Sequence, residues 1–507
     1  MTDTNYFAED RLIRVAVIGN SNSVMRNSFV EVLKQDQTLS VHNMSIGATP
    51  NIVLLDVLAT AGDLNHDIII VETAVIDAMQ GPSGAYPLDV ARRNLRIFIQ
   101  SISITSHAKI AFLLIPTRIA LLEPKRHNTE EMYLSLAAEF GIATLNLYNL
   151  FRQMLGGYSA DRVERLSALA PIVAENFAVP KHAVYDLSWS ALRDYNSISN
   201  CLVLIGFSDH AHVSRIIHRL AGRLLTSWIH GLPVCSNYSD AKSKSGLVRA
   251  MSAQLGDREP VTRQSTLMSR NLLGLESGET VKYICPPDHD IVGLFLNRSR
   301  TSGFLKLDSA RGSIILDCRF VRYPNPWVGV VVPIIDQIGG GEIILSVRSN
   351  NDAAAPVRCL PDTQDAVCEG CAEVAEMIAV RQSTLQNLAE ASSEDVSSNH
   401  YVSIENLASA QVICQETYQE LEEVADGIGP AGVGLSRGLA PLFSSFLKTD
   451  PIGSHAYSSA RAMLLMGDPY GAEQFLADKI ADGKHDPALP NLHQCLKTFL
   501  YGDDSQG

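Results

Sequence analysis

The stretch that most constrains the fold is Arg14 to Leu33, R-V-A-V-I-G-N-S-N-S-V-M-R-N-S-F-V-E-V-L. A short apolar run ends at Gly19 and is followed by apolar residues at roughly helical spacing, which is typical of a buried parallel strand that leads into a helix. Ser21 then lies in the turn at the carboxyl edge of a sheet, where open α/β sheets bind ligands. Free N–H groups at a helix start also favour an anion. The alternative interpretation is an ordinary strand–turn–helix unit in which Ser21 only caps the helix.

The same alternation continues over residues 11–230 and predicts a doubly wound parallel sheet. The strands and helices that follow the first turn are expected, in chain order, at Leu39–Met44, Asn51–Thr60, Asp67–Val71, Val90–Thr105, Ala108–Ile115, Thr129–Phe140, Ile142–Leu147 and Arg215–Trp228. Residues 157–200 are less regular and are expected to form an excursion over the sheet edge.

Composition narrows the class of protein. The chain has 507 residues, enough for about three domains, and its net charge of −14 argues against a general nucleic-acid binder. The first residues lack the basic start and apolar centre of a secretory signal, and no apolar run of about 18 residues predicts a membrane span. We therefore expect a cytoplasmic protein.

Cysteine spacing gives one candidate metal site. Cys368 and Cys371 have the local spacing of a zinc knuckle, with Cys359 upstream, but neither His400 nor Cys414 supplies the second pair that a structural zinc site needs. We predict reduced structural cysteines, no metal and no cofactor.

Two turns carry groups suited to acyl transfer. Such chemistry needs a hydroxyl nucleophile, an imidazole base and a carboxylate that orients the imidazole. Ser21 supplies the hydroxyl, and Asp209 and His212, three residues apart at a helix start, supply the other two groups. The alternative is that Asp209 is a helix cap and His212 a surface histidine.

Together these pieces resemble the SGNH or GDSL hydrolases. Gly19-Asn20-Ser21 is similar to the family's Gly-Asp-Ser turn, Gly47 in N-M-S-I-G-A-T-P to its second block, and Asp209-His210-Ala211-His212 to its last block. The resemblance covers about residues 11–230. It implies Ser21 as nucleophile, His212 as general base and Asp209 as the orienting carboxylate.

The resemblance also implies an oxyanion hole made by the backbone N–H groups of Ser21 and Gly47 and by an Asn side chain. In this sequence Ile76 stands where that Asn is expected, next to Asp77. Loss of one such donor costs about 10²–10³ in turnover. Thr73 or Asn22 are candidates to replace it.

The rest of the chain has a different sequence pattern. Residues 232–265 are polar and predict a linker or a loose loop. Residues 266–350 contain short β-rich runs that predict a sandwich-like domain, in which Trp327 and Tyr323 either line a sugar-binding face or pack in the core. Residues 367–500 predict a helical C-terminal region, including A-E-V-A-E-M-I-A-V, that suits self-association.

The resemblance thus implies an SGNH-type serine ester hydrolase or acyltransferase that acts on an acetyl or other short acyl ester of a carbohydrate. The alternative is a catalytically weak or inactive SGNH-fold protein that binds or assembles partners in polysaccharide production, which the Ile76 departure favours. Glu72 and Asp77 can also be interpreted as a carboxylate pair for glycoside hydrolysis, but the preferred interpretation is that they are ordinary polar residues at a strand end. A nucleotide-binding protein is weaker still, because the Gly19 turn lacks G-x-G-x-x-G and a Walker lysine.

Overall fold

A computed structural model gives the structure of the chain. It describes residues 12–25, 28–61, 64–81, 86–117, 128–154, 212–213, 215–232, 246–255, 258–265, 267–319, 327–349, 357–359, 368–391, 401–416 and isolated residues between 474 and 494. The chain divides into two compact units. The first contains residues 1–115, 127–146 and 222–404, and the second contains residues 116–126, 147–221 and 405–507.

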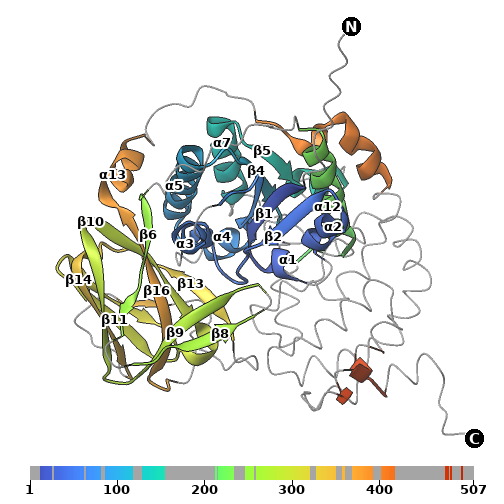
Figure 1. Cartoon of the computed structure of the whole chain (residues 1–507). Coiled ribbons are helices and arrows are strands. Elements are labelled where there is room, and N and C mark those ends of the chain that lie inside the picture. The colour runs from blue at the N-terminus through green and yellow to red at the C-terminus, as the bar shows by residue number, and fades with distance from the viewer. Residues whose placement is uncertain are drawn as a thin grey trace, which may run out of the picture. The chain divides into compact units, whose positions relative to one another are not determined.

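Five parallel strands form one sheet of the first unit, which confirms the predicted α/β class (Figure 1). They are β1 (Ile13–Gly19), β2 (Leu39–Asn43), β3 (Ile68–Glu72), β4 (Lys109–Leu114) and β5 (Ala143–Asn146). Their order across the sheet is β2-β1-β3-β4-β5, and each neighbouring pair is parallel. Every residue of β3 is buried, as expected for a central strand covered on both faces.

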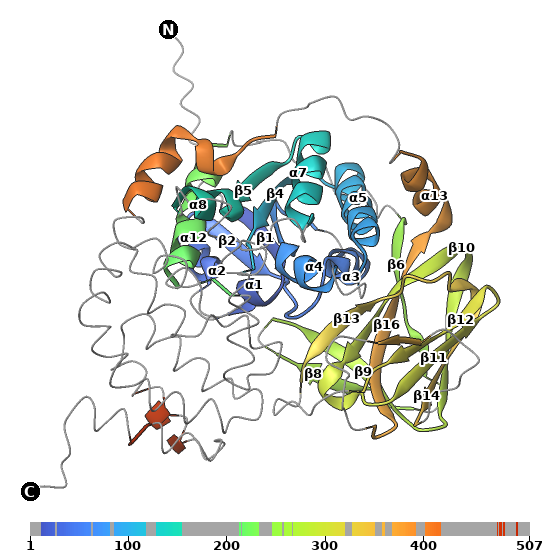
Figure 2. The same ribbon diagram turned by 180° about the vertical axis from the view of Figure 1, so that it is seen from behind.

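Helices connect these strands. They are α1 (Ser21–Val24), α2 (Phe29–Gln35), α3 (Ile52–Thr60), α4 (Ala74–Gln80), α5 (Leu88–Thr105) and α7 (Thr129–Phe140), with α8 (Leu147–Met154) and α12 (Arg215–His230) further along. Figures 1 and 2 show α3, α5 and α7 on one side of the sheet and α2 on the other. The helices predicted over residues 51–60, 90–105, 129–140 and 215–228 are confirmed to within two residues at each end.

The helix expected directly after Gly19 is the first correction. Two short helices replace it, because the backbone is extended at Met25 (φ −66°, ψ 147°) and at Ser28 (φ −69°, ψ 172°). A single turn of helix such as α1 has little dipole of its own. An anion at this turn would therefore depend on individual N–H groups rather than on a long helix.

The strand order has one topological switch point. The chain leaves β1 toward β2 on one side and continues from β3 toward β5 on the other, so the crossing connections diverge between β1 and β3. Open α/β sheets bind ligands beyond the carboxyl ends of the strands at such a point. The turn at Ser21 follows β1, and Glu72 ends β3 in register with Gly19.

The first unit also contains a second, mainly antiparallel sheet. Its strands are β6 (Val248–Met251), β7 (Ala253–Gln254), β8 (Val261–Gln264), β9 (Ser269–Glu276), β10 (Thr280–Asn297), β11 (Phe304–Ser309), β12 (Gly312–Asp317), β13 (Gly329–Pro333), β14 (Gly339–Arg348), β15 (Val357–Cys359) and β16 (Cys371–Arg381), followed by α13 (Gln382–Ala391). Strand β10 pairs with β7 and β14 near its start and with β16 and β13 near its end. The sheet thereby encloses one apolar core, with Leu294, Leu305 and Val374 among its buried residues.

Two interpretations of the sequence around this sheet were wrong. The run A-E-V-A-E-M-I-A-V, expected to be helical, forms most of β16, because pairing with β10, β9 and β6 outweighs the helix propensity of Ala, Glu and Met. The polar stretch expected to be a linker contains β6, β7 and β8, short strands that gain their hydrogen bonds from longer neighbours.

Candidate functional site

The turn after β1 contains two serines with different environments. Ser23 is 1% exposed, and its hydroxyl donates a 2.8 Å hydrogen bond to Glu72 Oε2. Ser21 is half-buried, and within the described part of the chain its hydroxyl makes no hydrogen bond. Ser21 is therefore the serine of this turn whose oxygen is available for chemistry.

Hydrogen bonds fix the backbone of this turn. Asn20 N donates to Glu72 O at 3.0 Å and also approaches Glu72 Oε2 at 3.2 Å, and Ser23 N donates to Asn20 O at 3.0 Å. Gly19 allows this close approach, since a Cβ there would overlap Ser23 Oγ and lie 2.8 Å from Glu72 O. The absence of a side chain at position 19 thus lets β3 pack directly behind Ser21.

The loop that contains Gly47 lies against the same turn. Ile46 N donates to Gly19 O at 3.0 Å, and Asn43 Nδ2 donates to Ser23 O at 2.8 Å. A Cβ on Gly47 would lie 3.7 Å from the Val24 side chain. The structure therefore brings together the two segments predicted to supply the backbone donors of an oxyanion hole.

Both predicted donor groups lack a hydrogen-bond partner in the described part of the chain. Among the described residues, neither the Ser21 N–H nor the Gly47 N–H donates a hydrogen bond, whereas the neighbouring Asn20, Ser23 and Ile46 N–H groups all do. Unpaired N–H groups at the edge of a half-buried turn can bind an oxyanion. Their geometry toward a bound ester is a prediction.

The segment after β3 does not supply a side-chain donor of the expected kind. Ile76 is 7% exposed in α4, and the Thr73 hydroxyl lies 2.6 Å from Tyr133 OH in a fully buried pair. Thr73 is therefore committed elsewhere, and the suggestion that it replaces the family Asn was wrong. Asn22, the other suggested replacement, is fully buried.

A buried polar network lies beneath this segment, and sequence reasoning missed it. Asp77 accepts hydrogen bonds from Asn51 N at 2.9 Å and from Tyr133 OH at 2.7 Å, while Tyr86 OH donates to Asn51 Oδ1. Burial raises the pKa of Asp77 to about 7, and hydrogen bonds from Tyr133 and Asn51 oppose that rise. These residues have no exposed surface, so they form part of the buried core and do not contact a substrate.

Glu72 and Asp77 do not form a carboxylate pair for glycoside hydrolysis. Both side chains are fully buried, whereas that chemistry requires carboxyl groups that flank a bound sugar. The preferred interpretation of strand-end polarity was incomplete, because both groups are enclosed in the protein rather than solvated.

The predicted base lies in the other compact unit. His212 is half-buried and precedes α12, and burial, with a smaller effect of His212, lowers the pKa of the buried His218 to about 3. Asp209 lies outside the described residues. Ser21 belongs to the first unit and His212 to the second, so their pairing and the role of Asp209 stay predictions.

Cys368 and Cys371, the pair considered for a zinc site, are engaged in structural contacts. Cys368 Sγ and Cys371 Sγ each donate to a carbonyl oxygen, of Ser349 and Arg300 respectively. Over the described ranges, no three His, Cys, Asp or Glu side chains gather as a metal site requires. Likewise, no helix in those ranges is long and apolar enough to cross a bilayer.

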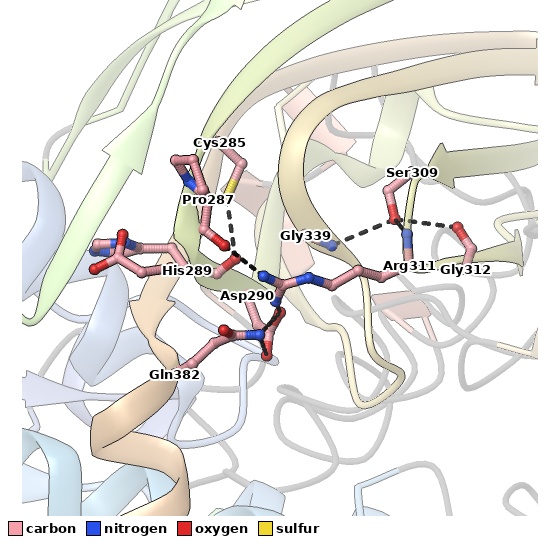
Figure 3. A network of polar contacts seen from close by, with 10 residues as sticks. Cys285, Pro287, His289, Asp290, Ser309, Arg311, Gly312, Gly339 and Gln382 are labelled. Carbon is pink, nitrogen blue, oxygen red and sulfur yellow. Dashed lines mark hydrogen bonds and ion pairs between the residues drawn. The ribbon is translucent and has the colours of Figure 1, made fainter.

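Figure 3 shows a second polar cluster, in the antiparallel domain. Arg311 donates to Asp290 Oδ1 and to the Pro287 carbonyl, and Gln382 Nε2 lies 3.3 Å from both Asp290 carboxylate oxygens. The charges are mutually paired and hold the start of α13 against β10. This cluster is therefore structural.

Trp327, one of the two aromatic residues considered for sugar binding, is half-buried. Its ring centroid lies 6.0 Å from that of the buried Phe295, over which Arg270 stacks at 4.9 Å. One side of the indole is thus used in packing. Tyr323 lies outside the described residues, and sugar binding by either residue stays a prediction.

The comparisons with known proteins found matches among solved structures only. No protein family model matches the sequence, and no curated protein matches it. Two solved structures of a two-domain esterase active on acetylated mannans, one of them co-crystallised with mannopentaose, are similar at 9% identity and a TM-score of 0.42, over 73% of this chain and 91% of theirs. A structure described as a lipolytic protein of the G-D-S-L family, from Desulfitobacterium hafniense DCB-2, is similar at 20% identity and a TM-score of 0.23, over 30% of this chain and 82% of its own.

The α/β domain of this chain is a five-stranded parallel sheet with helices on both faces. The serine turn follows β1 and the glycine loop follows β2, as the resemblance in sequence implied. The proposals that follow rest on this chain's own residues.

Proposed function

We propose that the chain is a serine ester hydrolase or acyltransferase of the SGNH type, with Ser21 as its nucleophile. One observation carries the proposal. At the switch point between β1 and β3, the Ser21 hydroxyl and the N–H groups of Ser21 and Gly47 are free within the described chain, while the neighbouring backbone N–H groups of Asn20, Ser23 and Ile46 are bonded. A free hydroxyl beside free N–H donors suits attack on an ester carbonyl.

In this mechanism, the Ser21 oxygen attacks the ester carbonyl carbon and passes its proton to His212, which Asp209 orients. The N–H groups of Ser21 and Gly47 stabilise the negative charge that develops on the carbonyl oxygen. His212 then donates the proton to the departing alcohol, and water or a second alcohol accepts the acyl group from Ser21. We propose an acetyl or short acyl ester of a carbohydrate as substrate.

A test of the chemistry is hydrolysis of p-nitrophenyl acetate by the full chain and by Ser21→Ala, His212→Ala and Asp209→Asn. We expect Ser21→Ala and His212→Ala to lower kcat at least about 10³-fold, since the two groups act as a unit. Ser103→Ala, on the exposed face of α5, and His230→Ala, near the end of α12, are the matched controls and should keep the wild-type rate. Acetate release from acetylated mannan and acetylated xylan then tests the substrate class.

A second candidate function is a binding or assembly protein that keeps the SGNH-like fold without efficient catalysis. The observation in its favour is the apolar Ile76 at the position of the third oxyanion donor, together with the engagement of Thr73 by Tyr133. Equal rates for the wild type and Ser21→Ala in the same assay would favour this function and contradict the first.

A further inference from the structure

The fully buried carboxyl of Glu72 lies directly behind the turn that holds Ser21. Its Oε2 accepts a hydrogen bond from the Ser23 hydroxyl at 2.8 Å and lies 3.2 Å from Asn20 N, so one oxygen contacts the residue before Ser21 and the residue two positions after it. Position 19 is a glycine, and Glu72 Oε2 lies 2.9 Å from the place that a Cβ would take there. Glu72 is thus the group against which the turn is built.

The surroundings of Glu72 favour its neutral form. Burial raises the pKa of Glu72 to about 8, and hydrogen bonds from Ser23 and Asn20 oppose part of that rise. Asp77 of α4, itself buried, raises the pKa further. On the turn, Glu72 packs against the uncharged Asn20 and Ser23, and β1 contributes apolar residues up to Gly19. Among the described groups that act on Glu72, no cation therefore opposes the rise in its pKa.

The proton of the neutral acid is expected on Oε1. Oε2 already accepts hydrogen bonds, whereas Oε1 is buried without a partner among the described residues. The Asn20 carboxamide is also fully buried, and both its Oδ1 and its Nδ2 lack partners in that part of the chain. Neither group can be solvated, so ionisation of Glu72 would place an uncompensated charge behind Ser21.

We propose that Glu72, as a neutral carboxylic acid, is the positioning residue of the nucleophile turn and that its ionisation inactivates the site. This inference rests on the proposed role of Ser21. A carboxylate at this place would repel the negative charge that forms on the substrate oxygen beside Ser21, and buried charges are weakly screened.

The consequence is an unusual pH profile. Deprotonation of the catalytic base activates the enzyme as the pH rises, and ionisation of Glu72 lowers the activity again near pH 8. We therefore expect kcat/KM to rise and then fall by at least about tenfold toward pH 9.5, because a bell-shaped profile reports the essential base and acid of the free enzyme. A serine hydrolase without such a carboxyl would keep its activity on the alkaline side.

The experiment compares wild type, Glu72→Gln and Glu139→Gln by measuring kcat/KM for p-nitrophenyl acetate between about pH 6 and about pH 9.5. The rate of Ser21→Ala is subtracted at each pH. Glu72→Gln keeps an acceptor for Ser23 and Asn20 but cannot ionise, so we expect it to lose the alkaline decrease. Glu139 of α7, which pairs with Arg96 of α5, is the matched control and should keep the decrease.

A second variant tests the contact itself. Ser23→Ala removes the hydroxyl that joins the turn to Glu72, and we expect kcat to fall at least about tenfold with KM unchanged, because the turn is displaced but substrate contacts are kept. Ser101→Ala, which removes another buried hydroxyl in α5, should leave kcat unchanged.

The outcomes separate this inference from the proposed function. If Ser21→Ala retains the wild-type rate, the proposed function and this inference are both wrong. If Ser21 is required but Glu72→Gln keeps the alkaline decrease, only this inference is wrong. If circular dichroism shows that Glu72→Gln does not fold, Ser23→Ala decides, and an unchanged kcat in that variant contradicts the inference.

Discussion

At the scale of single residues, the turn N-S-N-S separates two serines by two positions and gives them opposite environments. Ser23 is enclosed and hydrogen-bonded to Glu72, whereas the Ser21 hydroxyl is free among the described residues. The difference follows from the tight turn after Gly19, which directs Ser23 toward β3. Gly19 is therefore as important to the site as the serines.

Replacing Gly19 with Ala should damage both stability and activity. The added Cβ would overlap Ser23 Oγ and approach the Glu72 backbone, so we expect a loss of about 1–3 kcal/mol in the free energy of unfolding. Denaturant unfolding measures it. Gly274→Ala is the control, because nothing lies within 4 Å of its added Cβ, and equal losses in the two variants would contradict the prediction.

Restoring the family's Asn at position 76 tests the alignment of the third block. Under the proposed function, we expect Ile76→Asn to raise the Ser21-dependent kcat about 10-fold or more, since one oxyanion donor is worth about 10²–10³. The variant should also be less stable, because it places a carboxamide at a site that is only 7% exposed. Ile76→Val serves as control, and no gain in kcat over that control would argue against Ile76 lying at the oxyanion position.

At the scale of elements, the sequence predicted the strands of the parallel sheet because each is a compact apolar run that ends in turn residues. Ile68–Glu72 is the clearest case, since its five residues are all buried. Prediction failed where context outweighs local pattern, as in β16, whose Ala- and Glu-rich sequence favours a helix in isolation. The helix expected after Gly19 likewise gave way to α1 and α2.

The sequence also pointed to part of the candidate site. Ser21 was singled out by the rule that parallel strands present ligand-binding turns at their carboxyl ends, and Gly47 by the resemblance to the family's second block. The burial of Glu72 and the engagement of Thr73 were not predictable, because a single sequence does not say which polar side chain at a strand end faces inward. The pairing with His212 and Asp209 stays a prediction.

The packing of α12 on α2 gives a prediction at this scale. A Cβ on Gly222 would lie 2.5 Å from Val32 Cβ, so the two helices touch through the bare glycine backbone. Gly to Ala normally stabilises a helix by up to about 1 kcal/mol, but here we expect Gly222→Ala to lose about 1–3 kcal/mol through overpacking. Thermal unfolding shows whether the variant is more or less stable than the wild type. Thr226→Ala, half-buried on the same helix, should be neutral or slightly stabilising.

At the scale of the molecule, the parallel and antiparallel sheets belong to one compact unit and share buried contacts. Arg270 of β9 donates to Asp56 of α3 at 2.5 Å, and Val331 N of β13 donates to Thr49 Oγ1 at 3.3 Å, in the loop that follows Gly47. Ile52 of α3 also packs near Gly293 of β10. The antiparallel sheet thus packs against the loop that carries one of the proposed oxyanion donors.

The Asp56 contact makes the stability depend on pH in a definite direction. Burial raises the pKa of Asp56 from its usual 3.8 to about 6, although Arg270 opposes the rise. The folded state therefore binds more protons than the unfolded state between about pH 4 and pH 6, and the stability falls as the pH rises through that window.

We expect Asp56→Asn to remove this contribution. Relative to the wild type, the variant should gain about 3 kcal/mol in the free energy of unfolding between about pH 4 and pH 7, equivalent to the shift of about two pKa units. Urea unfolding at a series of pH values measures the difference. A constant difference between the two proteins across this range would show that Asp56 does not titrate as described.

The central claim is that Ser21, at the switch point between β1 and β3, is an activated nucleophile. The most direct measurement is mass spectrometry of the intact protein after reaction with a fluorophosphonate, followed by peptide mapping of the adduct. We predict one adduct per chain, located on Ser21 and lost in His212→Ala but retained in His230→Ala. Labelling of another residue, or no labelling of a folded wild-type protein, would contradict the account.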